Sequence, residues 1–182
     1  YDIDDIVLYA GQKLFPIVNE KNKYQYNKNF KSQEYELVEK RVLGITERLE
    51  IENLSDYALI EKRDFYRNVP KKTFNVVFTS CSLHYTANKD FSLEDKTKKL
   101  QSIVSVGGYL YIDYMMAIEE GDYTLYPKEK FYRKGEILKY FDNNWKIISY
   151  KENNLPSFEG AHVDCVKDHF HRFGYLLAKR IK

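Results

Sequence analysis

Hydrophobic residues are concentrated in one stretch near the middle of the chain. Residues 74–85 have the sequence Phe-Asn-Val-Val-Phe-Thr-Ser-Cys-Ser-Leu-His-Tyr, an apolar run that ends abruptly at small polar residues. Such a run, rich in β-branched and aromatic residues, is typical of a strand buried on both faces of a parallel sheet. A second run follows at residues 107–113, and apolar residues between the two runs fall on one helical face. The pattern predicts a βαβ crossover with its helix within residues 91–106.

Shorter patterns on both sides of this unit predict the remaining elements. In chain order they are a strand at 5–11, a strand or helix turn at 34–39, a helix ending near 50, a strand at 57–63, a helix at 134–141 and strands at 145–150 and 171–179. The last two strands can pair as a hairpin. Alternating strands and helices predict an α/β fold, a doubly wound, mostly parallel sheet with an antiparallel C-terminal edge hairpin.

Length and charge limit the classes of protein that fit this pattern. The chain has 182 residues, which suits a single domain over residues 1–182. It begins at Tyr rather than Met, so a segment upstream of Tyr1 could be absent from this sequence. The net charge is only +2 and the basic residues form no stripe, so we expect no nucleic acid and no membrane surface as partner. No apolar stretch is long enough to span a bilayer, and no signal-peptide pattern opens the chain.

The cysteine and histidine spacings match no metal or disulfide pattern. Cys81 and Cys165 form no C-x-x-C pair, so we expect neither a zinc site nor a disulfide framework, and we predict a reduced, cytoplasmic setting. The region from His162 to His171 carries histidines and aspartates, but their spacing fits no closed zinc pattern. We therefore predict no metal.

Residues that could hold a ligand follow the predicted strands. In open α/β sheets, ligands bind beyond the carboxyl ends of the strands, and a small or acidic residue stands at each of these ends. These residues are Gly11, Asp64, Ser80 with Cys81, and Asp113 with Tyr114. Each one alone is better explained as a turn residue or a helix cap, and only their recurrence at successive strand ends makes a ligand site an equal alternative. His84 could act as a base or orient a substrate, or could simply cap a helix. No glycine-rich phosphate loop and no G-x-S-x-G elbow occurs.

Five segments within residues 41–182 together resemble the class I S-adenosylmethionine-dependent methyltransferases, in particular their tellurite-resistance (TehB-like) branch. The segments are Glu52-Asn-Leu, Asp64-Phe65, the run at 74–85, Gly107-Gly-Tyr-Leu and Lys134-Gly-Glu-Ile-Leu-Lys-Tyr-Phe with the later Trp145. The resemblance implies a Rossmann-like fold and S-adenosylmethionine as the cofactor.

The resemblance also assigns roles at the cofactor pocket. Asp64 would bond the adenine amine and Phe65 would flank the adenine ring. Ser80 and Cys81 would line the pocket. An acidic residue that ends the second strand would hold the ribose hydroxyls, with Glu39 the first candidate and Glu36 the second.

The acceptor side is expected to come from two connections. Residues 115–133 form a long irregular stretch, and loops of that length usually have a function. Together with the His-bearing C-terminal connection, this stretch is expected to wall the site of a small-molecule substrate. The candidate contacts are Tyr114, Tyr126, His162 and Arg172.

One motif departs from the family pattern. The family has an acidic-x-G-x-G-x-G loop after its first strand, and the counterpart at residues 8–12 has only Gly11. Either the true motif lies upstream of Tyr1, or this chain has lost it. The sequence thus leaves two hypotheses. One is methyl transfer to an O, N, S or oxyanion acceptor, and the alternative is a non-catalytic methyltransferase-fold module for binding or scaffolding.

Overall fold

The computed structural model describes residues 11–17, 36–84, 90–117, 131–159 and 169–182. The chain divides into two compact units, residues 1–65 with 158–169 and residues 66–157 with 170–182. A single methyltransferase-like domain over residues 1–182 stays a prediction. In the described ranges, no helix combines the length and the apolar character needed to cross a membrane.

The first unit contains a two-stranded antiparallel sheet. Strands β1 (Gly11–Ile17) and β2 (Glu36–Val42) pair along their whole length, from Gly11 opposite Val42 to Ile17 opposite Glu36. The prediction that Gly11 ends the first strand is wrong, since Gly11 begins β1, and residues 5–10 lie outside the described ranges. A helix follows as predicted, α2 (Ile45–Ile51), with the extended residue Gly44 as its N-cap.

The strand predicted at residues 57–63 is absent. Its first residue ends a short 3-10 helix, η2 (Ser55–Tyr57), and the chain then has no regular element until Phe74. Tyr57 and Leu59 are largely exposed. An apolar sequence forms a strand only where neighbouring strands offer backbone partners and packing, and the pattern alone does not reveal whether such neighbours exist.

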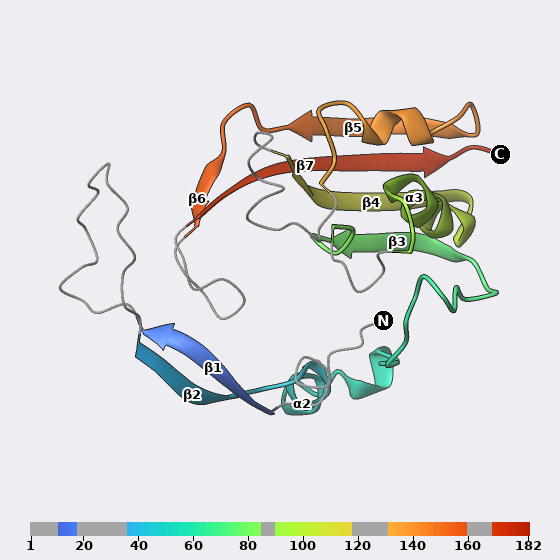
Figure 1. Ribbon diagram of the computed structural model, residues 1–182. Helices are drawn as coiled ribbons and strands as arrows, with labels where there is room; N and C mark the ends of the chain where they lie inside the picture. Colours follow the sequence, from blue (N-terminus) through green and yellow to red (C-terminus); the bar gives the residue numbers. More distant parts are fainter. Residues whose placement is uncertain (1–10, 18–35, 85–89, 118–130, 160–168) are drawn as a thin grey trace. The chain divides into compact units, whose positions relative to one another are not determined.

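The second unit is built on a mixed sheet with the strand order β3-β4-β7-β5 (Figure 1). Its strands are β3 (Phe74–Ser80), β4 (Val104–Met116), β7 (His169–Arg180) and β5 (Trp145–Glu152), and the short β6 (Ser157–Glu159) pairs with β7. Strands β3 and β4 are parallel, whereas β7 is antiparallel to both β4 and β5. The α/β class, the βαβ crossover and the antiparallel C-terminal edge are therefore confirmed.

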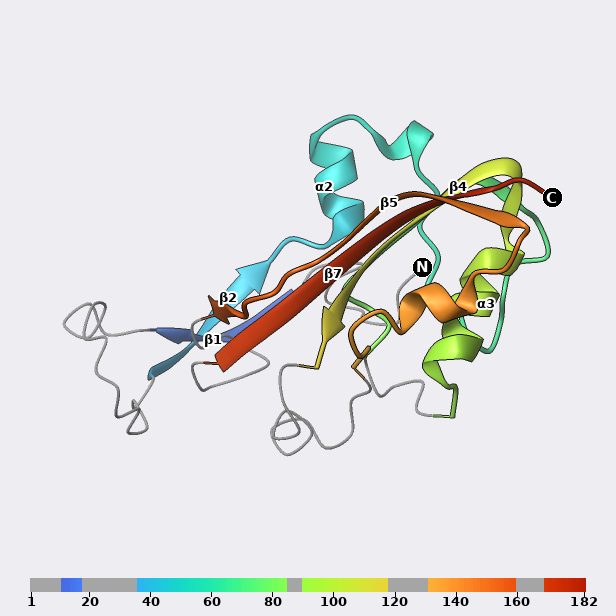
Figure 2. The ribbon, with the colours of Figure 1, turned by 90° about the horizontal axis from the view of Figure 1, so that it is seen from above.

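The crossover helix α3 (Leu93–Ser102) has a strong start signal. The Ser92 side chain accepts a hydrogen bond from the Asp95 amide at 3.0 Å, and the Asp95 carboxylate accepts from the Ser92 amide at 3.0 Å. This reciprocal capping box satisfies two amide groups that the first helical turn leaves without partners. Helix α3 lies against one face of the sheet beside the 3-10 helix η4 (Ile137–Tyr140), as Figure 2 shows.

Glycines account for two differences from the predicted elements. Strand β4 begins at Val104 rather than Gly107, and its register against β3 shifts between Phe74 and Val76. Gly107 has φ +85°, so the predicted Gly-Gly turn is an irregularity inside β4. The α-helix predicted at residues 134–141 is only η4, because Gly135 just before it has φ +72°.

The core of the second unit lies between α3 and the sheet. Alternate residues of β4, including Leu110, Ile112 and Tyr114, are fully buried. The prediction that the strand at 74–80 is buried on both faces is wrong, since Val76 and Phe78 are 64% and 65% exposed. Phe78 instead stacks on Tyr111 of β4, with ring centroids 5.2 Å apart.

Candidate functional site

Strand β3 ends at Ser80, which lies opposite Asp113 of the parallel strand β4, and β4 continues to Met116. The chain leaves β3 at Cys81, which has the left-handed φ of +42°. The Cys81 amide donates to the Asp113 carboxylate at 2.7 Å and also to the Asp113 carbonyl at 3.1 Å. A left-handed conformation is unfavourable for a residue with a side chain, and these hydrogen bonds hold it in place. Asp113 therefore fixes the turn at the carboxyl end of β3.

The residues after this turn fold back into the interior. The hydroxyl oxygens of Thr79 and Ser82 lie 2.6 Å apart, within hydrogen-bond distance. Leu83 is fully buried and His84 is only 3% exposed. The His84 ring stacks on Phe131, with centroids 5.6 Å apart and planes 13° apart. The imidazole is therefore held by packing at the carboxyl end of the parallel strands.

A buried lysine supports this turn from helix α3. Lys96 is 1% exposed, and its Nζ donates to the Leu83 carbonyl at 2.7 Å. The ammonium also lies 5.7 Å from the centroid of the Tyr66 ring. Lys96 is absent from the residues predicted from the sequence. It lies three positions after Leu93 and four before Leu100, and therefore on the buried face of α3. A lysine within the apolar stripe of a helix was the available signal.

Burial and neighbouring charges act together on His84. The pKa of His84 is lowered to about 4, first by burial and then by the positive charges of His171 and Lys96. The imidazole is therefore neutral at neutral pH and has a lone pair that can accept a proton. Burial also raises the pKa of the Tyr66 phenol, which stays protonated.

A second set of contacts positions Phe131. The next residue, Tyr132, bridges to Met116 at the end of β4, and the Ala117 amide donates to the Tyr132 carbonyl at 3.0 Å. The Tyr132 hydroxyl lies 2.8 Å from Thr97 Oγ1, which donates to the Leu93 carbonyl at 2.7 Å. Tyr132 thus connects α3 to the end of β4 and holds the ring beside His84.

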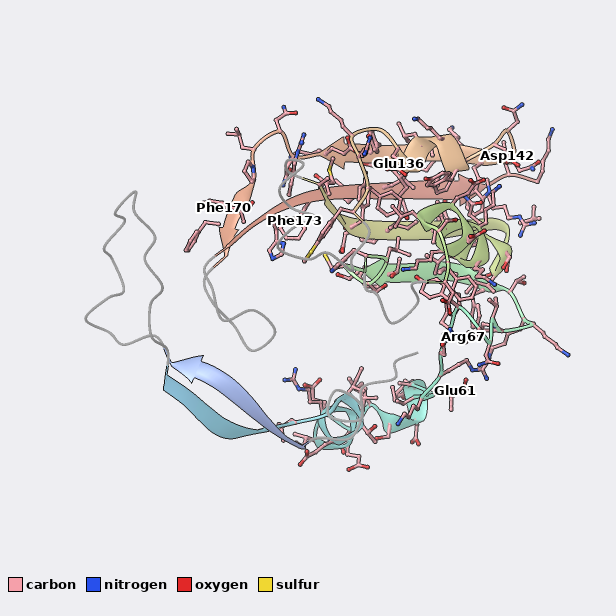
Figure 3. All side chains as sticks on the ribbon, in the orientation of Figure 1. Glu61, Arg67, Glu136, Asp142, Phe170 and Phe173 are labelled. Atoms are coloured by element: carbon pink, nitrogen blue, oxygen red, sulfur yellow. The ribbon has the colours of Figure 1, made fainter. Side chains whose placement is uncertain are left out.

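An open cavity of about 740 Å³ has Phe131 among its lining residues. Its lining residues come from the start of α3 and the segment around η4: Ser92, Leu93, Phe131, Arg133, Lys134, Glu136, Lys139 and Tyr140. Glu136, labelled in Figure 3, accepts from the Tyr140 hydroxyl at 2.7 Å and from the Arg133 amide at 2.8 Å. Phe131 both stacks on His84 and lines the cavity, so one ring joins the two features.

The predicted substrate contacts fall in different places. Tyr114 is fully buried and its hydroxyl donates to Glu152 at 2.9 Å, while its ring lies where a side chain at Gly174 would stand. Arg172 Nε donates to the Asn153 carbonyl at 2.6 Å. Tyr126 and His162 lie outside the described residues. Contact of these four residues with a substrate stays a prediction.

The predicted cofactor residues fit the structure only in part. Ser80 and Cys81 lie at the end of a parallel strand, as the cofactor role requires. Gly11 and Glu39 instead belong to the antiparallel pair β1–β2, where Glu39 lies opposite Leu14 in the middle of β2. Asp64 and Phe65 are half-buried residues of the first unit and follow no strand. For these four residues the strand-end argument does not apply, and their cofactor contacts stay predictions.

The described residues contain no group of three or more His, Cys, Asp or Glu side chains arranged to hold a metal ion.

Comparison with known proteins gives a likeness in fold. No family model and no curated protein matches the sequence. Among solved structures, TehB from Haemophilus influenzae is similar, with a TM-score of 0.53 and 16% sequence identity over 75% of this chain and 45% of TehB. An O-methyltransferase family protein from Burkholderia thailandensis gives a TM-score of 0.49 and 16% identity over 72% of this chain and 38% of that one. The chain spans less than half the length of either structure.

The likeness to TehB agrees with the mixed sheet and the βαβ crossover of the second unit. At this level of identity it shows the fold alone. The chain has a Rossmann-like α/β fold, with TehB as a structural neighbour.

Proposed function

We propose that this chain is the whole or a part of a methyltransferase that transfers a methyl group from S-adenosylmethionine to a small-molecule acceptor. The observation that carries the proposal is the neutral, buried His84 at the carboxyl end of β3, beside the turn that Asp113 fixes. The fold likeness to TehB supports the same assignment. In this sheet class the carboxyl end of the parallel strands is where ligands bind.

The chain's own residues would have simple tasks in this reaction. S-adenosylmethionine, when bound, supplies a methyl group on a positively charged sulfur. Ser80 and Cys81 would line the cofactor pocket at the end of β3, where the turn at Cys81 is already held in place. An in-line displacement needs mainly alignment of the acceptor with the methyl carbon. His84 would take the proton that an acceptor O–H, N–H or S–H loses as the new bond forms.

The acceptor itself is proposed only by class. A small molecule could enter through the cavity of about 740 Å³ beside Phe131. Oxygen, nitrogen, sulfur and oxyanion acceptors are all compatible with its mixed lining. We also keep the cytoplasmic setting as part of the proposal, on the basis of the cysteine pattern.

Calorimetric titration with S-adenosylhomocysteine tests the proposal. We expect the parent chain to bind, and we expect Asp113→Ala, which removes the acceptor that holds the turn at Cys81, to weaken binding about tenfold, or about 1.4 kcal/mol. Asp56→Ala, an exposed position in η2, is the matched control and should bind as the parent does. No binding to the polypeptide, with any upstream residues of its gene restored, would contradict the proposal.

A second candidate function follows from β1 and β2. Gly11 begins an antiparallel strand rather than a glycine-rich loop, which favours a non-catalytic methyltransferase-fold module for binding or scaffolding. This candidate predicts a stably folded chain with no affinity for S-adenosylhomocysteine. An intact glycine-rich loop encoded immediately upstream of Tyr1 would count strongly against it.

A further inference from the structure

Helix α3 carries a fully buried ammonium group beside the candidate site. Taking a lysine out of water is costly, and a methionine of similar size would fill the same space at lower cost. Contacts with described residues offset part of this cost, among them the 2.7 Å hydrogen bond from Lys96 to the Leu83 carbonyl and the Tyr66 ring at 5.7 Å from the ammonium. A buried charge that is retained next to a candidate base indicates a role in the site.

We propose that Lys96 is a positioning residue for His84: it holds the peptide that precedes His84 and keeps a positive charge beside the imidazole. The inference rests on the proposed function, and it narrows the acceptor to a group that must lose a proton. A base that is kept neutral serves an O–H, N–H or S–H acceptor, whereas an acceptor that is already an anion needs none.

The hydrogen bond explains the positional part of the proposal. Leu83 and His84 are consecutive residues, so the carbonyl that Lys96 holds belongs to the peptide unit leading into His84. The ring of His84 also stacks on Phe131, with ring centroids 5.6 Å apart. The imidazole is thus fixed from α3 through the backbone and from the segment before η4 through its ring.

The charges around His84 explain the electrostatic part. Among the described residues, Lys96 of α3 and His171 of β7 both lower the pKa of His84, in addition to burial. Burial raises the pKa values of the phenols of Tyr66 and Tyr132, which stay neutral. Removal of the Lys96 charge should therefore let the pKa of His84 rise toward its ordinary value.

The helix offers a matched control for this lysine. Lys98 is two residues further along α3 and exposed, and its Nζ pairs with Glu94 at 2.5 Å on the outer face. Replacement of either lysine by methionine removes one positive charge from the same helix. Only replacement of Lys96 removes it from the interior.

The first test measures the titration midpoint of His84 by NMR in the whole chain. The chain has four histidines, and a His84→Gln variant assigns the ring signal. We expect Lys96→Met to raise the midpoint by roughly half a pH unit or more, and Lys98→Met to leave it unchanged. Lys96→Arg should stay near the parent value because the charge is kept. A midpoint that Lys96→Met leaves unchanged in a folded chain would overturn the inference.

A second variant covers the case in which Lys96→Met does not fold. Lys96→Gln keeps a donor for the Leu83 carbonyl but removes the charge, so it should raise the midpoint of His84 with less loss of stability. If this variant titrates like the parent, the electrostatic part is wrong.

Kinetics with S-adenosylmethionine and a protic acceptor give the second test. Lys96→Met should lower kcat about tenfold and leave the KM for S-adenosylmethionine unchanged, with the acidic limb of the pH–rate profile moved upward, and Lys96→Arg should recover part of the rate. An unmoved pH–rate profile would contradict the inference. Failure of the parent to bind S-adenosylhomocysteine would instead overturn the proposed function, while the NMR titration would still decide whether Lys96 acts on His84.

Discussion

At the scale of single residues, the candidate site depends on polar groups that are held in the interior. The imidazole of His84 and the ammonium of Lys96 are almost completely buried, and the amide of Cys81 is held by Asp113. Buried polar groups are favourable only when the surrounding structure satisfies or neutralises them. The two residues meet this requirement differently: the Lys96 side chain donates a hydrogen bond to the Leu83 carbonyl, whereas the lowered pKa of His84 leaves its imidazole neutral at neutral pH.

The neutral state of His84 predicts a loss of stability in acid. The pKa of His84 is about 4 in the folded chain, against an ordinary value of 6.5. The folded chain therefore binds this proton less well than the unfolded chain, and protonation favours unfolding. The contribution is fully present above about pH 6.5 and is lost as the pH falls through about 4, with a limit of about 3 kcal/mol.

Urea unfolding at pH 7 and pH 5 checks this expectation. The parent chain should lose more free energy of unfolding between the two pH values than His84→Gln, because the variant has no imidazole to protonate. An equal loss in both proteins would show that other groups carry the acid sensitivity.

At the scale of elements, helix α3 links the strand ends to the cavity. Its first turn lines the cavity through Ser92 and Leu93, and its buried face carries Lys96 and Thr97 toward His84 and Tyr132. A shift of the helix start would therefore move both features together. The capping box at Ser92 is what determines where this helix begins.

Removal of the cap should destabilise the chain by a predictable amount. Ser92→Ala takes away the acceptor of the Asp95 amide, and we expect the free energy of unfolding to fall by about 1 kcal/mol. The control is Ser102→Ala at the other end of α3, where the hydroxyl donates to the Lys99 carbonyl on the surface. That change should stay within about 0.5 kcal/mol of the parent in the same urea titration. Equal effects at the two ends would argue against a special role of the cap.

Local patterns predicted the elements whose partners are close in sequence. The run at 74–80, the helix after Ser92 and the return through Asp113 form one crossover, so each element supports the interpretation of the next. The strands at 145–150 and 171–179 were also found, with small changes at their ends.

The remaining elements and contacts depend on groups distant in sequence. The residues predicted as a strand at 57–63 form no regular strand, and Gly11 belongs to an antiparallel strand because β2 lies opposite it. In the candidate site, the position of His84 after a strand identifies it as a candidate residue. Its stacking on Phe131 cannot be predicted from the sequence. Lys96 is not predicted as a site residue because a lysine on a helix is usually exposed to solvent. Its hydrogen bond to the Leu83 carbonyl, which accounts for its burial, becomes visible only in the structure.

At the scale of the whole molecule, the sheet of the second unit depends on its last strand. Strand β7 lies between β4 and β5 and pairs with both. Lys179 lies opposite Tyr109 of β4, and Arg180 lies opposite Trp145 of β5. It also supplies Leu176 and Ala178 to the core. In the described sheet, β4 and β5 do not pair with each other.

A chain shortened to end at residue 156 should therefore lose its cooperative fold, although β3, α3, β4 and β5 are all retained. We expect circular dichroism to show no sigmoidal thermal transition. A chain shortened by Ile181 and Lys182 alone keeps β7 and is the matched control. A cooperative transition in the shorter chain would show that the pairing of β3 with β4 is sufficient for the fold.

The same strand order has a consequence for the time course of synthesis. Strand β7, which joins β5 to the rest of the sheet, is translated after the other strands of that sheet. A nascent chain on the ribosome would hold β4 with one edge open and its apolar side chains uncovered until β7 emerged. Open strand edges and exposed apolar surface are what chaperones bind and what drives aggregation. The yield of this protein in cells should thus depend on the interval between the synthesis of β5 and the synthesis of β7.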